Sequence, residues 1–150
     1  MANANEHAVH VLNGLIETTL DSADGYQQAA EQAVNPAFKT LFQERATRRQ
    51  QLTTQLKDEV RTFGGEPETD GSILAKSQRA FRDFKKKIAG QSDKAVIDQV
   101  EAGEDAIRNR FEKAAMDSDL PAEARELIER AYSSVRADHD EISALKHQTH

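Results

Sequence analysis

The stretch that decides the fold runs from residue 63 to residue 93 and reads FGGEPETDGSILAKSQRAFRDFKKKIAGQSD. Its first part, GGEPETDGS, is the most loop-like segment of the chain, because Gly, Pro, Asp and Ser favour turns over regular helix. The amphipathic remainder, from about Ser72 to Ala89, predicts a short helix of roughly 26 Å. A connection of this length can carry the chain from one end of a helical bundle back to the other.

Long amphipathic helices are predicted on both sides of this connection, because apolar residues recur there at spacings of three and four. The predicted helices cover about Asn5 to Ala33, Pro36 to Phe63, Asp93 to Asp117 and Pro121 to His147. The first two are separated only by a short break at Asn35-Pro36, and the last two by an equally short one, so each pair is expected to pack antiparallel.

These elements predict an all-α protein with a single domain covering residues 1–150. The tight hairpins at either end and the long connection between helices two and three are typical of a ferritin-like four-helix bundle, rather than of simple up-down-up-down topology. The crossover would carry the additional short helix.

Composition excludes several classes of function. The chain has 150 residues and no cysteine, which rules out disulfides, thiolate zinc sites and a cysteine nucleophile. Its net charge of −6 argues against a nucleic-acid partner. No apolar stretch approaches the ~20 residues of a membrane span, and the N-terminal residues lack the pattern of a secretory signal. A cytoplasmic protein without a membrane partner is the expectation.

A few polar residues share the apolar faces of the predicted helices. Glu104 is the clearest, since it lies between Val100 and Ile107, and a buried carboxylate needs a partner. The other inward candidates are Arg45, Tyr26, Thr19, Asp138 and His139, with Glu101 nearer the edge. One interpretation is a structural polar layer in which Arg45 pairs with Glu104 and in which Asp138, His139 and Tyr26 complete the hydrogen bonds; such layers fix helix register.

The alternative interpretation is a metal site built from Glu104 and His139, with Glu101 or Glu44 as further ligands. Carboxylate and imidazole suit iron, manganese or zinc. The full di-iron pattern requires Glu-x-x-His on two helices, and the sequence contains none. An inward Arg45 would also repel a cation. Any centre for iron or another divalent ion would therefore be degenerate, in the sense that it would lack part of the di-iron ligand set.

The predicted crossover helix is locally basic. Its cationic residues are Lys76, Arg79, Arg82, Lys85, Lys86 and Lys87. A solvated surface is the usual meaning of such a run, and docking to an acidic protein partner is the alternative. The sequence is also compatible with a homodimer.

Several segments resemble a bacterial family of ferritin-like four-helix proteins of unknown function. They are VLNGLIETTLDSADGYQQAAE at 11–31, LFQERA at 41–46, FGGEPETDGS at 63–72, EAGEDAIRNRFEKAAMDSDLP at 101–121 and YSSVRADHDEI at 132–142. The chain departs from the family at 78–81, where Gln-Arg-Ala-Phe stands in place of a His-Arg-x-Trp motif.

The resemblance implies a small bacterial cytoplasmic protein, with stress-linked roles by analogy and no established reaction. The family landmarks include Glu104 and His139, which are also inward polar residues here. Two hypotheses follow: a non-enzymatic bundle with a structural or partner-binding role, and a metal-binding bundle that stores a metal or reacts with oxygen or peroxide.

Overall fold

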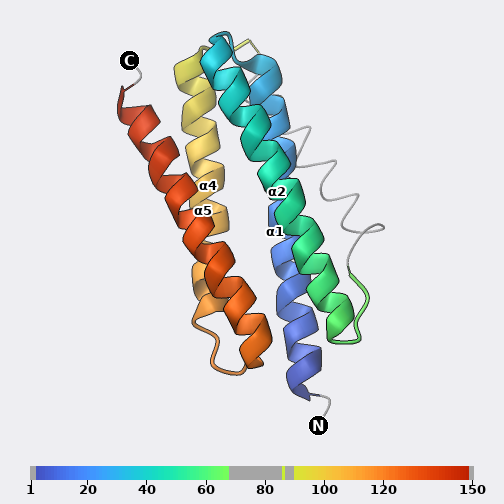
Figure 1. Ribbon diagram of the computed structural model, residues 1–150. Coiled ribbons are helices and arrows are strands. Elements are labelled where there is room, and N and C mark those ends of the chain that lie inside the picture. The colour runs from blue at the N-terminus through green and yellow to red at the C-terminus, as the bar shows by residue number, and fades with distance from the viewer. Residues whose placement is uncertain (1–2, 68–85, 87–89, 149–150) are drawn as a thin grey trace.

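A computed structural model describes residues 3–67, 86 and 90–148 of the chain, and its described part is built from four long helices (Figure 1). They are α1 (Asn3–Gln32), α2 (Pro36–Thr62), α4 (Asp93–Ala115) and α5 (Ala122–Gln148). The prediction of an all-α four-helix bundle is therefore confirmed. The short helix predicted between residues 72 and 89 lies outside the described residues, apart from Lys86, which is helical and exposed.

Local sequence signals explain where α2 and α4 begin and where α2 ends. The Asn35 side chain accepts a hydrogen bond from the Ala37 amide at 2.9 Å, and Pro36 occupies the first turn, where its missing amide proton costs nothing. Ser92 caps α4 in the same way. Beyond the end of α2, Gly64 adopts φ +81°, a conformation that a residue with a Cβ rarely takes.

The order of the helices in space agrees with a long crossover (Figure 1). Helix α1 runs up from the N-terminus and α2 runs back down, then α4 also runs down and α5 returns upward. Contacts fix both ends of this arrangement. The Asp93 carboxylate accepts hydrogen bonds from the main-chain amides of Val34 and Asn35, which places the start of α4 beside the α1–α2 turn. At the other end, the His7 ring bonds to Asp117.

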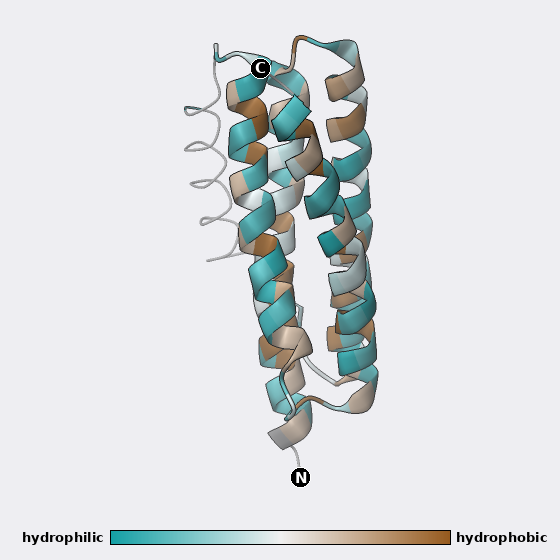
Figure 2. Ribbon diagram, turned by 90° about the vertical axis from the view of Figure 1, so that its left-hand side faces the viewer, coloured by the Kyte–Doolittle hydropathy of each residue, from teal (hydrophilic) through white to brown (hydrophobic). Residues whose placement is uncertain are grey.

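The helices α2 and α4 are consequently parallel, and the end of α2 and the start of α4 lie at opposite ends of the bundle (Figure 1). The sequence-based prediction of a long return connection, instead of a hairpin, is confirmed by the position of these two ends. Each helix alternates between hydrophilic and hydrophobic residues along its length, as amphipathic helices do (Figure 2). Within the described part of the chain, no helix is long and apolar enough to cross a bilayer.

The core divides into two apolar clusters. The lower cluster contains residues such as Leu12, Leu56, Phe111 and Ile128, and the upper cluster contains residues such as Phe42, Ile97 and Ile142. A polar layer lies between them, because three helices each carry a buried charged residue between their residues of the two clusters. These residues are Arg49 of α2, Glu104 of α4 and Asp138 of α5. This layer contains most of the inward polar residues that the sequence singles out.

Candidate functional site

Glu104 of α4 is the centre of the polar layer, with only 1% of its surface exposed. The Tyr26 hydroxyl of α1 donates a hydrogen bond to Oε1 at 2.6 Å. The Arg49 guanidinium of α2 contacts Oε1 through Nη1 at 2.8 Å and donates from Nη2 to Oε2 at 3.0 Å. Both carboxylate oxygens are therefore held by a two-pronged Arg–carboxylate pair, the strongest kind of charged hydrogen-bond contact.

Arg49, and not Arg45, is the residue that pairs with Glu104, so the predicted Arg45–Glu104 pair is wrong. The two arginines stand one helical turn apart, and both are buried. A signal for Arg49 is present in the sequence, because it stands seven residues from both Phe42 and Leu56 and shares their face. Arg45 stands four residues from Leu41 and seven from Leu52, so helical spacing alone does not decide which of the two arginines pairs with Glu104.

Arg45 lies one turn nearer the upper cluster, with 1% of its surface exposed. Its Nη1 donates long hydrogen bonds, each 3.4 Å, to the Tyr26 hydroxyl and to the main-chain oxygen of Asp138. Its Nε is 3.6 Å from Asp138 Oδ2, and its Nη2 is 3.4 Å from the carboxylate of Glu141. Within the described residues, neither Nε nor Nη2 of Arg45 makes a hydrogen bond.

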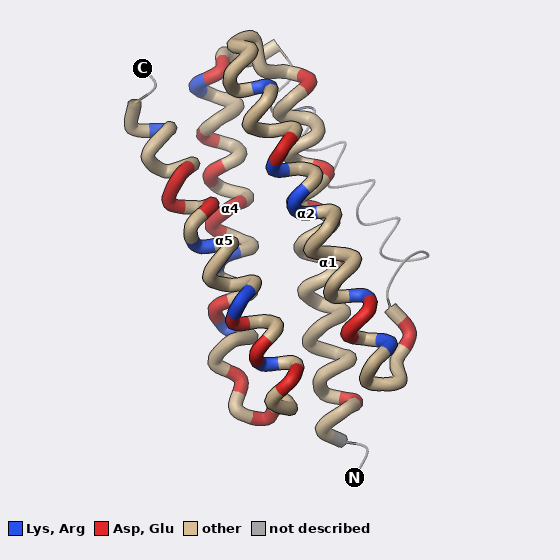
Figure 3. The backbone as a smooth tube through the Cα atoms, viewed as in Figure 1, with Lys and Arg blue, Asp and Glu red and all other residues tan. Residues whose placement is uncertain are grey.

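Asp138 of α5 is shared by three arginines of α2. Its Oδ1 accepts a hydrogen bond from Arg48 Nη1 at 2.7 Å, and its Oδ2 accepts one from Arg49 Nη2 at 3.2 Å and lies near Arg45 Nε. The two arginines farther inside also stack against the Tyr26 ring, with guanidinium carbons 5.7 Å and 5.5 Å from its centroid. Figure 3 shows the basic residues midway along α2 at the height where α4 and α5 carry acidic ones.

Burial and neighbouring charges shift the pKa values of two groups in the layer, Tyr26 and Arg49. Burial, followed by the negative charge of Glu104, raises the pKa of Tyr26 well above its ordinary value, so the phenol stays a neutral donor. Burial alone would lower the pKa of Arg49, but Glu104, Tyr26 and Asp138 together outweigh it, so the pKa is raised. Tyr26 is thus held as a neutral donor and Arg49 as a cation.

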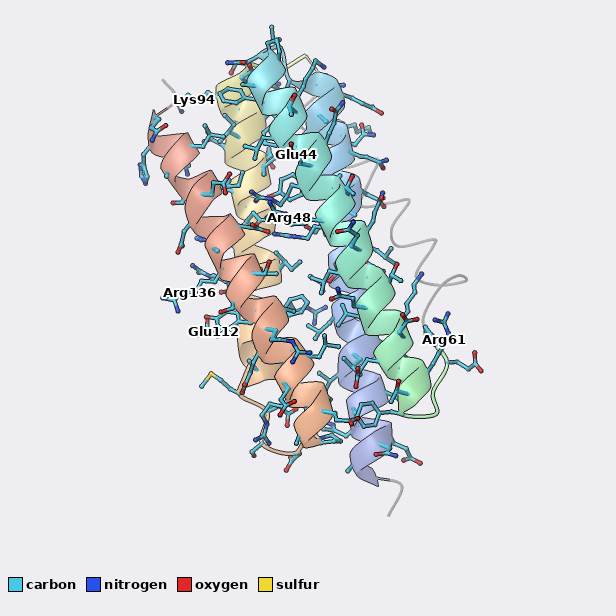
Figure 4. All side chains as sticks on the ribbon, viewed as in Figure 1. Glu44, Arg48, Arg61, Lys94, Glu112 and Arg136 are labelled. Atoms are coloured by element: carbon cyan, nitrogen blue, oxygen red, sulfur yellow. The ribbon has the colours of Figure 1, made fainter. Side chains whose placement is uncertain are left out.

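The four residues suggested as metal ligands do not converge. Glu104 is bound to Arg49, whereas the His139 ring contacts Asp105 through Nε2 and lies 3.4 Å from Asp140 through Nδ1. Glu101 accepts a hydrogen bond from Lys146 at 2.8 Å. Glu44 is exposed on the outside of α2 (Figure 4). In the described ranges, no group of three or more His, Asp or Glu side chains is placed to hold a metal ion.

A groove of about 510 Å³ runs between α2 and α5, next to the polar layer. Its upper end is lined by Arg48, Arg49 and Asp138, and its lower end by Asp58, Glu59 and Arg130. The apolar part of the lining consists of Leu52, Leu127, Ala131 and Val135. This volume is in the range of pockets that bind small organic molecules.

Comparison with known proteins gives a family and no function. The profile of a domain of unknown function, DUF2383, matches residues 7–117, a span that includes Tyr26, Arg49 and Glu104 and ends before α5. No curated protein matches the sequence. Because the matched span covers well over half of the 150 residues, the chain belongs to the DUF2383 family of unknown function.

Proposed function

We propose that this protein is a non-enzymatic, ferritin-like helical bundle that acts by binding a partner, with an ion-pair layer at the level where a metal centre would stand. The observation that carries the proposal is the Arg49–Glu104 pair, in which one guanidinium holds both carboxylate oxygens. The resemblance to bacterial ferritin-like proteins adds a stress-linked role to the proposal, by analogy alone.

The chemistry of the donor set supports this choice over a metal centre. A carboxylate that ligates a metal must offer a free oxygen lone pair, and those of Glu104 face Arg49 and Tyr26. Two buried guanidinium groups at the same level would also repel a divalent cation. His139, the only imidazole in the suggested ligand set, contacts Asp105 instead of Glu104. The residues therefore fit an ion-pair layer better than they fit an iron site.

The alternative is a metal-binding bundle that stores iron or another divalent metal, or reacts with oxygen or peroxide, through Glu104 and His139. Its support is that both side chains are buried, on helices that pack against each other. Elemental analysis of untagged protein separates the two proposals. We expect less than about 0.1 metal ion per chain, unchanged in the Glu104→Ala, His139→Ala double variant. One or two ions per chain that disappear in this variant would refute the ion-pair proposal.

The partner-binding part of the proposal uses the basic residues of the crossover, namely Lys76, Arg79, Arg82, Lys85, Lys86 and Lys87. Of these, only Lys86 lies among the described residues, and it is exposed. Reversing the charge of Lys85, Lys86 and Lys87 to Glu should abolish cross-linking of an acidic protein partner in cells. Retention of the same cross-linked species by this variant would count against docking, and a species of twice the chain mass would indicate a homodimer.

A further inference from the structure

The side of α1 that faces away from the bundle core is acidic. Glu17 and Asp21 each stand two residues from Thr19, which is fully buried. Asp24 stands two residues before Tyr26 of the polar layer. A separation of two residues is about 200° around a helix, so the three carboxylates share the outer face of α1. Helix α1 contains no Lys or Arg, and this face is therefore negative on balance.

The outer face of α1 is nevertheless covered. Gln28 belongs to it, since it stands two residues after Tyr26, yet only 3% of its surface is exposed. Its Oε1 makes no hydrogen bond within the described residues. Asp24 is partly buried, and burial, followed by the charge of Asp21, raises its pKa. The described helices bond to α1 on its inner side, α4 at Tyr26 and α2 at Ser22, so they do not account for this burial.

The connection between α2 and α4 is the part of the chain that can supply the cover. The burial arises within a single chain, so a partner protein is not its cause. The end of α2 and the start of α4 lie at opposite ends of the bundle, and α1 packs against both helices (Figure 1). The helix of roughly 26 Å expected for residues 72–89 exceeds the ~16 Å that separates Glu17 from Gln28 along α1. Residues 1–2 and 149–150 are too few for this role.

The sequence of residues 72–89 is complementary to the outer face of α1. It contains six cationic residues and a single acid, Asp83. Its apolar residues form one stripe, which needs a surface to cover it. They are Leu74, Phe81, Phe84 and Ile88. The outer side of α5 is less complementary, because exposed Arg130 and Arg136 stand there among the acids.

We propose that the outer face of α1, with Glu17, Asp21 and Asp24, is the docking surface for the basic segment 72–89 of the same chain. The apolar stripe of the segment lies against α1, and cations beside the stripe pair with the three carboxylates. Lys86 is exposed, so it belongs to the other side of the segment.

This contact has a consequence for partner binding, which rests on the proposed function. The cations that would dock an acidic partner are the same ones that face the carboxylates of α1. An acidic partner therefore competes with α1 for the segment, and the contact is autoinhibitory. The docking itself does not depend on the existence of a partner, so the two ideas can fail separately.

Carbodiimide cross-linking of the full chain tests the docking, because this reagent joins a carboxylate to a lysine amine only where the two groups touch. The acids of α1 stay in one tryptic peptide, residues 1–39, which makes the product easy to assign. We expect a product of single-chain mass in which Glu17, Asp21 or Asp24 is joined to a lysine of residues 76–87. Links from these lysines only to α5, only between chains, or to no acid at all would overturn the proposal.

Neutral variants separate the contact from a general effect of charge. The test variant alters the outer face of α1 and carries Glu17→Gln, Asp21→Asn and Asp24→Asn. The matched control makes the same change in net charge at exposed positions of α4 and α5, namely Glu112→Gln, Glu126→Gln and Glu129→Gln. Of these, Glu112 projects from the far side of the bundle (Figure 4). Circular dichroism checks that both variants remain folded.

We expect trypsin to cleave within residues 76–87 about 10-fold faster in the test variant than in the control or the natural sequence, because release exposes the segment. Poly-glutamate, as the acidic probe, should bind the test variant about 10-fold more tightly than the control. Equal cleavage rates in the two variants would overturn the docking, and equal affinities for poly-glutamate would overturn the competition. If no form of the chain binds poly-glutamate while the cross-link forms, the partner-binding function and the competition are refuted and the docking stands.

Discussion

At the scale of single residues, the sequence predicts which polar groups face inward better than it predicts their partners. Glu104, Asp138 and Tyr26 stand between apolar neighbours at helical spacing, so their burial follows from periodicity. The partner of Glu104 depends on the axial shift between α2 and α4, which periodicity does not contain. A shift of about one turn, ~5.4 Å, exchanges Arg45 for Arg49.

The Arg49–Glu104 pair leads to a prediction about stability. Removing Arg49 alone leaves a carboxylate uncompensated in the core, so Arg49→Met should lower the free energy of unfolding by about 3–5 kcal/mol. Replacing both partners, with Arg49→Met and Glu104→Leu, should recover most of this loss, because apolar side chains of similar size need no partner. Urea unfolding followed by circular dichroism measures the cycle.

Arg136→Gln, an exposed change on α5, provides the baseline for this cycle and should stay within about 0.5 kcal/mol of the natural sequence. If the double variant loses as much stability as the sum of the single changes, Arg49 and Glu104 do not act as a pair. If Arg45→Met restores the Glu104→Leu variant better than Arg49→Met does, the pairing assigned by sequence was the right one.

At the scale of the elements, local signals determined the helix ends because each signal acts within a few residues. Asn35-Pro36, Gly64 and Ser92 mark starts and stops that the structure places within about two residues of their predicted positions. The parallel orientation of α2 and α4 follows from the length of the connection between them. The groove between α2 and α5 was not predicted, because helix separation depends on side-chain packing across elements far apart in sequence.

Two glycines with opposite roles give a prediction at this scale. Gly64 has φ +81°, so Gly64→Ala should destabilise the protein by about 1–2 kcal/mol. Gly103 lies inside α4, and a Cβ built there meets nothing within 4 Å, so Gly103→Ala should stabilise it by about 0.5–1 kcal/mol. Thermal unfolding of both variants checks the signs. A loss of stability in Gly103→Ala would show that a neighbour of α4 occupies that space.

At the scale of the whole molecule, the ion pairs that link helices at the surface set the response to acid. Glu101 and Asp117 sit at partly exposed contacts, Glu101 with Lys146 of α5 and Asp117 with His7 of α1. A hydrogen bond from Lys146 lowers the pKa of Glu101, and one from the His7 ring lowers the pKa of Asp117. The first bond joins α4 to α5, and the second joins α1 to the turn that follows α4.

A carboxyl group whose pKa is lowered by folding stabilises the folded state above its unfolded pKa, near 4, and this contribution is lost as pH falls through the folded pKa. Stability should therefore decline below about pH 4, and Glu101→Gln should lower the urea midpoint at pH 7 more than at pH 3. Glu59 is a control of opposite sign, because burial, followed by the charge of Glu123, raises its pKa. Glu59→Gln should raise the midpoint at pH 7 relative to pH 3. If the two variants shift the pH dependence in the same direction, the acid response does not arise from the Glu101–Lys146 contact between α4 and α5.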